Sequence, residues 1–461
     1  MALKLPSKRS ATVAPWEKAF DRFISPFEQF VHRETTGGMI LIAATIVALL
    51  LANLPMTAEW YQHMLHAELG IRIGEWRLVH SAHHWINDGL MALFFFVVGL
   101  EIKREVLTGE LSEWQQAILP IIAAIGGMVV PALIYYALNA GTPTEAGWGV
   151  PMATDIAFAV GVLALLGSRV PKALLTFLVA LAIVDDLGAV IVIALFYTDD
   201  LVLIELLFVA VSFLLMMALN RFGIRKPMPY AVLALFMWMA MLESGVHATL
   251  AGVLAALTIP SRSIFEFERF YAMTRGVLDR LEKRAVNRDV ACTLTDQEAE
   301  RRGVHHALVN GVKMIETPAQ RMEQRMHAPV AFVILPLFAL ANAGIALDLS
   351  QLGGLFGQPV AMGVVAGLVL GKLIGVAGVS LIAVRLGLAQ MPTGVTPGHL
   401  VGVGLLAGIG FTMSIFIAEL GLGADAQTLV VAKTAILAAS LIAGVGGYLW
   451  LRRIPTGSAQ S

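Results

Sequence analysis

The chain is 461 residues long, and 57% of its residues are hydrophobic whereas only 14% are charged. That balance leaves too little polar surface to cover a water-soluble globule, so the natural solvent of the chain is a lipid bilayer. A formal net charge of −1 gives no sign of a nucleic-acid-binding surface.

Long apolar stretches recur along almost the whole chain. A bilayer core requires about 20 consecutive apolar residues per helix. The predicted transmembrane helices, about twelve in all, cover residues 37–54, 84–101, 116–138, 151–167, 173–197, 201–219, 228–243, 245–260, 329–346, 358–383, 398–419 and 427–451. The fold class is therefore an all-α membrane protein.

The distribution of Lys and Arg among the loops predicts the orientation. Positive residues gather in short cytoplasmic loops. The predicted outer loops without Lys or Arg are 139–150, 198–200, 347–357 and 420–426, and only the first outer loop departs, with Arg72 and Arg77. Both termini are therefore expected in the cytoplasm.

The same pattern predicts three parts: a cytoplasmic N-terminal segment (1–36), a transmembrane domain (37–451) and a cytoplasmic tail (452–461). The first segment is charged and lacks the apolar core of a cleaved signal peptide. A cytoplasmic loop insert at 261–327 interrupts the transmembrane domain. It either contains an amphipathic helix on the inner leaflet or is a solvated, partly disordered insert.

A short polar segment follows the first predicted helix. Residues 69–78 alternate apolar and polar side chains around a Gly-Glu pair, a pattern typical of a β-hairpin. The segment is expected on the periplasmic side, and the alternative is an ordinary loop.

Among the ionisable residues within predicted helices, four stand out: Asp155, Asp185, Asp186 and Lys372. Each costs roughly 2.5–3.5 kcal/mol at the bilayer centre, so such residues are expected to be functional. Two neighbouring carboxylates repel each other and bind protons jointly. Their oxygen atoms also suit a hard cation such as sodium. One site could therefore hold either protons or a transported sodium ion, which is the requirement for an antiporter.

Structural alternatives exist for these residues. Asp185 and Asp186 could cap helix ends, but they lie near the middle of their predicted helix. Lys372 could extend to a membrane interface. Gly371 and Gly375 beside it would allow close helix packing, which favours a buried ion pair with a carboxylate.

Asp155 belongs to one of two interrupted helices. It could simply cap the second half of its own helix. The stretch 408–414 is a second interruption, with Gly and hydroxyl residues in an apolar run. The predicted helices 3–5 and 10–12 would then be inverted-topology repeats whose broken helices cross at the midplane. Asp155 would neutralise the helix N-termini there, and Lys372 the opposing C-terminal carbonyls.

Several motifs resemble the NhaA family of sodium/proton antiporters. They include ATDIAFA at 153–159, AIVDDLG at 182–188 and GIGFTMS at 408–414, and the resemblance extends from about residue 28 to 450. Inverted repeats with broken helices are known from NhaA itself, so this agreement is not independent.

The resemblance implies a secondary transporter of the bacterial inner membrane rather than an enzyme. Sodium or lithium would leave in exchange for external protons, electrogenically and under pH control, and no cofactor is implied. Asp185 and Asp186 would carry sodium and protons, and Lys372 would be the membrane-buried lysine. The helix crossing would comprise Thr154, Asp155, Gly408, Gly410 and Thr412.

The resemblance further implies a cytoplasmic pH-sensing cluster and a homodimer joined through the hairpin at 69–78. The sensing residues would be Glu101, Arg104, Glu105, His247, Glu323 and His327. Each could instead be a surface charge that fixes topology. Gln320 and Gln324 depart from the family pattern, which leaves the pH set-point open.

Two other functions use the same residue types. An intramembrane aspartyl protease would pair Asp155 with Asp186, but it gives no role to Lys372. A passive sodium channel could use the same acidic cavity, but paired helix interruptions favour alternating access.

Overall fold

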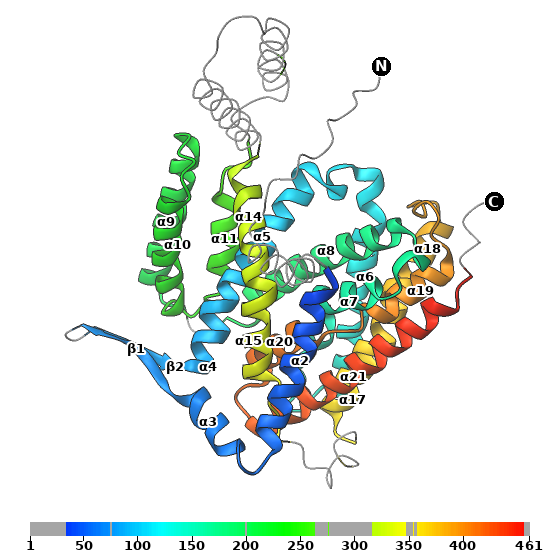
Figure 1. Ribbon diagram of the computed structural model, residues 1–461, viewed down its shortest axis with the longest axis horizontal. Helices are drawn as coiled ribbons and strands as arrows, with labels where there is room; N and C mark the ends of the chain where they lie inside the picture. The colour runs from blue at the N-terminus through cyan, green and yellow to red at the C-terminus, as the bar shows by residue number, and fades with distance from the viewer. Residues whose placement is uncertain are drawn as a thin grey trace, which may run out of the picture.

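The computed structural model describes residues 34–73, 76–198, 201–262, 316–346 and 357–455, together with Arg275 and Gly354. Within these residues the protein is a bundle of helices with one small sheet (Figure 1). Most of the predicted segment 1–36, most of the insert 261–327 and the end of the tail 452–461 lie outside the described residues.

The bundle begins with α2 (Glu34–Asn53) and a short helix, α3 (Ala58–His66). The Tyr61 hydroxyl of α3 donates a 2.5 Å hydrogen bond to the carbonyl oxygen of Leu340, and burial raises the pKa of Tyr61 to about 12. The side chain therefore stays neutral and ties α3 to the bundle.

The predicted hairpin is confirmed. Strands β1 (Glu68–Ile73) and β2 (Trp76–Ser81) are antiparallel, with Glu68 opposite Ser81 and Ile73 opposite Trp76. Figure 1 shows the hairpin projecting from the helices beside α3 and α4. The sheet is slightly longer than the predicted 69–78.

Apolar helices long enough to cross a bilayer account for most of the described chain. Nine such spans occur in the described residues: Thr36–Asn53, Ala82–Thr108, Trp114–Asn139, Glu145–Ala164, Lys172–Phe196, Leu203–Arg221, Pro318–Asn342, Pro359–Arg385 and Ala426–Arg453. The pair Pro397–Leu406 and Phe411–Leu422, bent by 48°, makes a tenth if counted as one span.

The predicted count of twelve spans is not confirmed, because two predicted helices are too short by this measure. Helix α10 (Pro227–Leu242) has 16 residues and α11 (Leu250–Thr258) has nine. Gly245 lies between them with a φ of +83°, a conformation that few other residues adopt, so helix cannot continue through this point.

The remaining elements follow the spans. The named α-helices are α4 (Ala82–His84), α5 (Met91–Thr108), α6 (Trp114–Asn139), α7 (Ile156–Ala164), α8 (Lys172–Phe196), α9 (Leu203–Arg221), α14 (Pro318–Pro329), α15 (Leu335–Asn342), α17 (Pro359–Val365), α18 (Val379–Arg385), α19 (Pro397–Leu406), α20 (Phe411–Leu422) and α21 (Ala426–Arg453). Wider π-helical turns join α4 to α5 (Trp85–Leu90), α14 to α15 (Val330–Ile334) and α17 to α18 (Ala366–Gly371 and Leu373–Gly378).

The two largest hydrophobic clusters hold the bundle together. The larger one includes residues of α2, α5 to α8, α15, α17 and α19 to α21, and the smaller one lies mainly among α9, α10 and α11. Figure 1 shows α9 and α10 side by side at one edge of the molecule. Leu203 and Leu214 of α9 remain 78% and 64% exposed. Such large apolar side chains on an outer helix suit contact with lipid.

Candidate ion-binding site

Two adjacent carboxylates lie inside the bundle on α8. Asp185 and Asp186 are each 1% exposed, near the middle of this 25-residue helix. The alternative of helix-end capping is therefore excluded. Among the described residues, Oδ1 of Asp186 has no hydrogen-bond partner, and Asp185 interacts with Thr154 in addition to Lys372. Buried oxygen atoms without partners are costly, and both protons and hard cations would satisfy them.

Lys372 supplies the opposite charge. Its side chain is completely buried, and its Nζ atom lies 2.8 Å from Oδ2 of Asp185. The predicted buried ion pair is confirmed, and extension of Lys372 to an interface is excluded. The lysine lies between two π-helical segments, Ala366–Gly371 and Leu373–Gly378.

Glycines bring the lysine helix close to α6. A Cβ atom added to Gly375 would lie 2.2 Å from the carbonyl oxygen of Gly126, and one added to Gly371 would lie 2.7 Å from the Cα atom of Pro131. Only glycine permits such an approach between backbones. The predicted role of Gly371 and Gly375 in close packing is therefore confirmed.

The two interrupted helices contact each other directly. The Thr154 hydroxyl donates to the carbonyl oxygen of Ala407 at 2.9 Å, and the Asp155 amide donates to that of Ile409 at 2.7 Å. Asp155 Oδ2 accepts from the amide of Thr412 at 3.1 Å and from its hydroxyl at 2.6 Å. The predicted crossing residues thus meet in one place.

Asp155 is a cap for both crossing helices. Its Oδ1 accepts from the amide of Phe158 at 3.0 Å, at the start of α7, while Oδ2 binds Thr412 at the start of α20. A carboxylate there offsets the partial positive charge of two helix N-termini. The capping alternative and the predicted neutralising role are therefore both correct.

Lys372 was predicted to neutralise the C-terminal carbonyls of the crossing helices, but in the structure it pairs with Asp185. The carbonyls of Ala407 and Ile409 accept from Thr154 and Asp155, and the Lys372 ammonium group donates to Asp185. Thr154 and Asp155 already satisfy these two carbonyls, so the ammonium group of Lys372 is free to pair with a carboxylate.

Gly408 and Gly410 allow the second crossing segment to pass close to its neighbours. A Cβ atom at Gly408 would lie 2.4 Å from the carbonyl oxygen of Leu368, and one at Gly410 would lie 2.1 Å from the hydroxyl of Ser414. Gly408 therefore excludes a side chain because its neighbour is backbone, whereas the neighbours of Gly410 are side chains that would have to move.

Four of the six predicted pH-sensing residues lie together. Arg104 binds Glu105 at 2.9 Å and Glu323 at 3.0 Å, which joins α5 to α14. Glu101, one turn earlier on α5, interacts electrostatically with these charges and with Asp186. This group thus lies between the bundle end and the interior aspartates.

The two predicted histidines lie elsewhere. His327 is exposed on α14, one turn after Glu323. His247 precedes α11 and interacts electrostatically with Asp88, which is about 20 Å along the helix from Glu101 at 1.5 Å per residue. The structure therefore does not bring His247 together with the charged group.

Gln320, one of the departures from the family pattern, has a local structural role. Its side-chain oxygen accepts from the amide of Thr317 at 3.1 Å, and the Thr317 hydroxyl accepts from the amide of Gln320 at 3.1 Å. This reciprocal capping box stabilises the start of α14.

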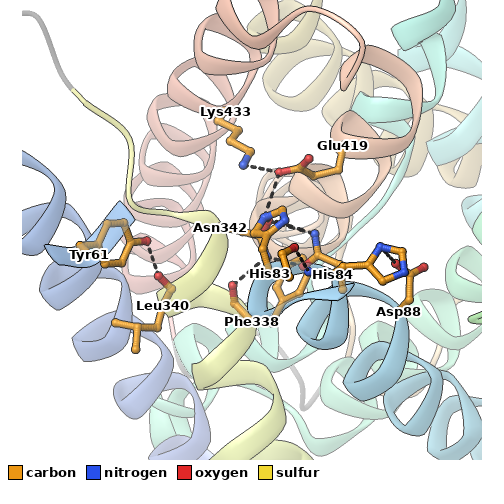
Figure 2. Close-up of polar contacts among 11 residues, drawn as sticks. Tyr61, His83, His84, Asp88, Phe338, Leu340, Asn342, Glu419 and Lys433 are labelled. Carbon is orange, nitrogen blue, oxygen red and sulfur yellow. Dashed lines mark hydrogen bonds and ion pairs between the residues drawn. The ribbon is translucent and has the colours of Figure 1, made fainter. Parts of the chain in front are cut away.

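A second polar network was missed from the sequence. It joins α4, α15, α20 and α21, and Figure 2 shows its polar contacts. Its principal members are His83, Asn87, Asn342, Glu419 and Lys433. Glu419 and Lys433 are ionisable residues within predicted helices, so the rule that found Lys372 could have found them.

An apolar cavity of about 690 Å³ lies elsewhere, among α5, α9, α10, α11 and α14. No charged side chain of the described chain lines it, and its walls include Trp85, Trp238 and Met326. It offers no ligands to an ion, so the interior aspartates remain the candidate ion site.

The fold and this site define a class. The protein is a multi-pass membrane protein in which two broken helices cross beside a buried Asp–Lys pair and a further aspartate. Such features are typical of secondary transporters.

Comparisons with known proteins identify the family. The family model described as "Na+/H+ antiporter 1" matches residues 28–451. The chain is 51% identical over 441 residues to "Na(+)/H(+) antiporter NhaA" of Sulfurimonas denitrificans, covering 96% of this chain and 98% of that protein. It is 52% identical to "Na(+)/H(+) antiporter NhaA 1" of Saccharophagus degradans, covering 95% and 94%. The chain belongs to the Na+/H+ antiporter 1 family and is of the NhaA type.

Proposed function

We propose that this protein exchanges sodium for protons across the membrane at Asp185 and Asp186. The observation that carries the proposal is the fully buried Lys372–Asp185 pair directly beside Asp186. Family membership supports the same exchange, because the similar proteins are named Na+/H+ antiporters. Sodium and protons are therefore the proposed substrates.

Competition for the carboxylates provides the coupling. Sodium requires oxygen ligands, and Asp185 offers one oxygen to Lys372, while Oδ1 of Asp186 has no partner among the described residues. A sodium ion held by Asp185 and Asp186 displaces the proton of Asp186 and breaks the Lys372–Asp185 pair, and Lys372 then releases a second proton. Proton return reverses these steps.

The net charge moved sets the driving force. Exchange of two protons for one sodium moves one charge, which is worth about 2.3 kcal/mol per 100 mV of membrane potential. We propose that the protein extrudes sodium in this electrogenic way and that external protons enter in exchange. Lithium, also a small hard cation, should replace sodium.

The crossing is the proposed pivot of alternating access. Asp155 binds the N-termini of α7 and α20 together, while breaks in the helices at the crossing interrupt both spans. The spans from α6 to α8 and from 359 to 453 would be inverted-topology repeats, and movement of one unit against another would expose the site to each side in turn.

Regulation by pH is proposed for the charged group that includes Glu101, Arg104, Glu105 and Glu323. It interacts with Asp186 through Glu101, so its protonation changes the field at the ion site. His327 lies one turn from Glu323, and His247 would act separately, beside Asp88.

The proposed setting is the bacterial inner membrane with both termini in the cytoplasm. The loop charges support this orientation. The segments 1–36, 261–327 and 452–461 would then be cytoplasmic, and the hairpin periplasmic. A homodimer could form through the exposed edge of β1 or β2, as unpaired strand edges invite pairing.

The contacts favour this function over the two alternatives. A protease would share a proton between Asp155 and Asp186, but both oxygens of Asp155 already accept hydrogen bonds at the crossing. A passive channel has no need of a lysine bound to one carboxylate of its pore.

The function is tested by proton-gradient dissipation in everted membrane vesicles, followed with a pH-sensitive dye between pH 6.5 and 9. Sodium and lithium should dissipate the gradient in wild-type vesicles, whereas potassium tests selectivity. Asp186→Asn should abolish the response because it removes the carboxylate that sodium and the proton share.

The matched control is Asp425→Asn, an exposed aspartate that caps α21 through the amides of Gln427 and Thr428. It should retain the wild-type response. Preserved exchange in inserted Asp186→Asn protein would refute the site, and no sodium response in the wild type would refute the function.

A further inference from the structure

Polar and aromatic side chains alternate along one face of α20. Thr412, Phe416 and Glu419 are spaced by one helical turn each, so they lie one above another. Thr412 binds Asp155 at the crossing. Glu419, about 10 Å further along the helix axis, belongs to the second polar network.

Helix α15 likewise places an aromatic residue one turn before a polar residue of the second network. Phe338 precedes Asn342 by one turn, and the Asn342 amide donates to the carbonyl oxygen of Phe338 at 3.0 Å. The ring of Phe416 lies 6.3 Å from that of Phe338 and 5.6 Å from that of Phe95 on α5. All three rings are buried. An aromatic layer therefore separates the crossing from the second network.

The second network connects two groups of helices. Lys433 of α21 forms an ion pair with Glu419 of α20. His83 of α4 lies between α20 and α15. Its Nε2 atom is 3.7 Å from Oε1 of Glu419 and 3.1 Å from Oδ1 of Asn342. Figure 2 shows His83 between Glu419 and Asn342. In the proposed orientation this network lies at the outer end of the bundle.

The hydrogen bonds fix one proton on His83. Asn342 Nδ2 donates to two acceptors, the carbonyl oxygen of Phe338 and Oδ1 of Asn87. The atom of Asn342 that faces His83 is therefore Oδ1, which only accepts, so the shorter contact, at 3.1 Å, assigns the hydrogen to Nε2 of His83. Nδ2 of Asn87 lies 3.4 Å from both Nε2 and Oδ1, and in this arrangement it donates to Oδ1. A further proton can add only at Nδ1, which makes the ring a cation.

Burial of the ring opposes a positive charge on His83 most strongly, and the charges around the ring modify that cost. Glu419 favours the cation, whereas Lys433 opposes it by binding the same carboxylate. His66 of α3 also interacts with His83 electrostatically. On its own element, His84 binds Asp88 at 3.2 Å and stacks on His80.

We propose that His83 and Glu419 form an external proton-binding site, placed outside the aromatic layer of Phe95, Phe338 and Phe416. This inference rests on the proposed antiport function. A proton from the outer solution adds to Nδ1 of His83, and Glu419 stabilises the resulting imidazolium. The site loads the proton before the aromatic layer opens toward the interior aspartates.

The test varies the pH inside everted vesicles, whose lumen faces the outer side of the protein. Sodium uptake is measured against luminal pH with the medium held at one pH and at saturating sodium. Glu419→Gln should require about tenfold more luminal protons for the half-maximal rate, because a partner charge shifts such an equilibrium by one or more pH units. His83→Gln should shift in the same direction.

Lys433→Gln gives the opposite sign. It removes the competitor for Glu419, so the half-maximal luminal pH should rise. A purely structural role would not reverse the shift between two substitutions in one ion pair. His83→Gln leaves the Lys433–Glu419 pair intact, so it reports on proton binding even if Glu419→Gln fails to fold.

The matched control is Glu59→Gln, which neutralises an exposed His–Glu pair formed with His63 on α3. Its luminal pH profile should match the wild type. The inference is overturned if His83→Gln and Lys433→Gln also match the wild type, or if both shift in the same direction, while sodium exchange persists. If the wild-type protein shows no sodium exchange, the proposed function is overturned, and this inference with it.

Discussion

At the scale of single residues, a charge buried in a membrane is costly unless it has a partner. Asp155, Asp185, Asp186 and Lys372 are all buried, as their positions in apolar runs indicated. The partner of Lys372 could not be predicted, because three carboxylates were candidates and Asp185 lies 187 positions away in the chain. Distances between remote positions come only from packing.

The Lys372–Asp185 pair gives a stability prediction. Lys372→Met leaves an uncompensated buried carboxylate, and breaking such a pair costs about 3–5 kcal/mol. The double variant Asp185→Asn with Lys372→Met removes both charges and should recover most of that loss. Thermal unfolding of the purified proteins measures both. A double variant no more stable than the single lysine variant would contradict the assigned pairing.

At the scale of elements, local signals located the hairpin and both helix interruptions. The Gly-Glu pair in an alternating segment predicted β1 and β2, and the Gly and hydroxyl residues of 408–414 predicted the break before α20. The division of 228–260 into two full spans is not confirmed, since α10 has 16 residues and α11 begins only at Leu250. The average hydropathy of a 20-residue window does not reveal a short turn, and Gly245 forms such a turn between α10 and α11.

The crossing gives a prediction for elements. Thr412→Val removes the hydroxyl that donates to Asp155 at 2.6 Å but leaves the backbone donor. The loss of a hydrogen bond to a charged group costs roughly 1.5–3 kcal/mol. We therefore expect a lower melting temperature and slower sodium exchange, and Thr412→Ser should restore both.

Thr428→Val is the matched control for the crossing. Thr428 also donates its hydroxyl to an aspartate, Asp425, but this pair is exposed at the start of α21. Its substitution should leave sodium exchange unchanged. Equal losses of exchange in Thr412→Val and Thr428→Val would show that the crossing has no special role.

At the scale of the whole molecule, composition predicted a membrane protein and the helices agree. The apolar faces of outer helices such as α9 remain exposed, and charged side chains gather inside or at the bundle ends. Which charged residues form a group was decided by packing. His247 lies beside Asp88, far from the other predicted sensors, because α11 runs parallel to α5 and begins near Asp88.

Orientation gives a prediction for the whole molecule, because the chain has a single cysteine, Cys292, in the predicted cytoplasmic insert. A membrane-impermeant maleimide should label it in everted vesicles and not in intact spheroplasts, whose outer face is accessible. Cys292→Ser, which should abolish labelling, is the control. The reverse pattern would invert the proposed orientation, and with it the outer position of His83.

The sequence by itself determined the membrane class, the positions of most helices, the hairpin and the interior charges. Hydropathy, glycine and turn signals are local, and a charge within an apolar run is visible without any contact. The tertiary structure alone decided that Lys372 binds Asp185, that Asp155 caps two helices, and that His83 meets Glu419 and Lys433. These contacts join distant segments, and their geometry arises only when the helices pack together.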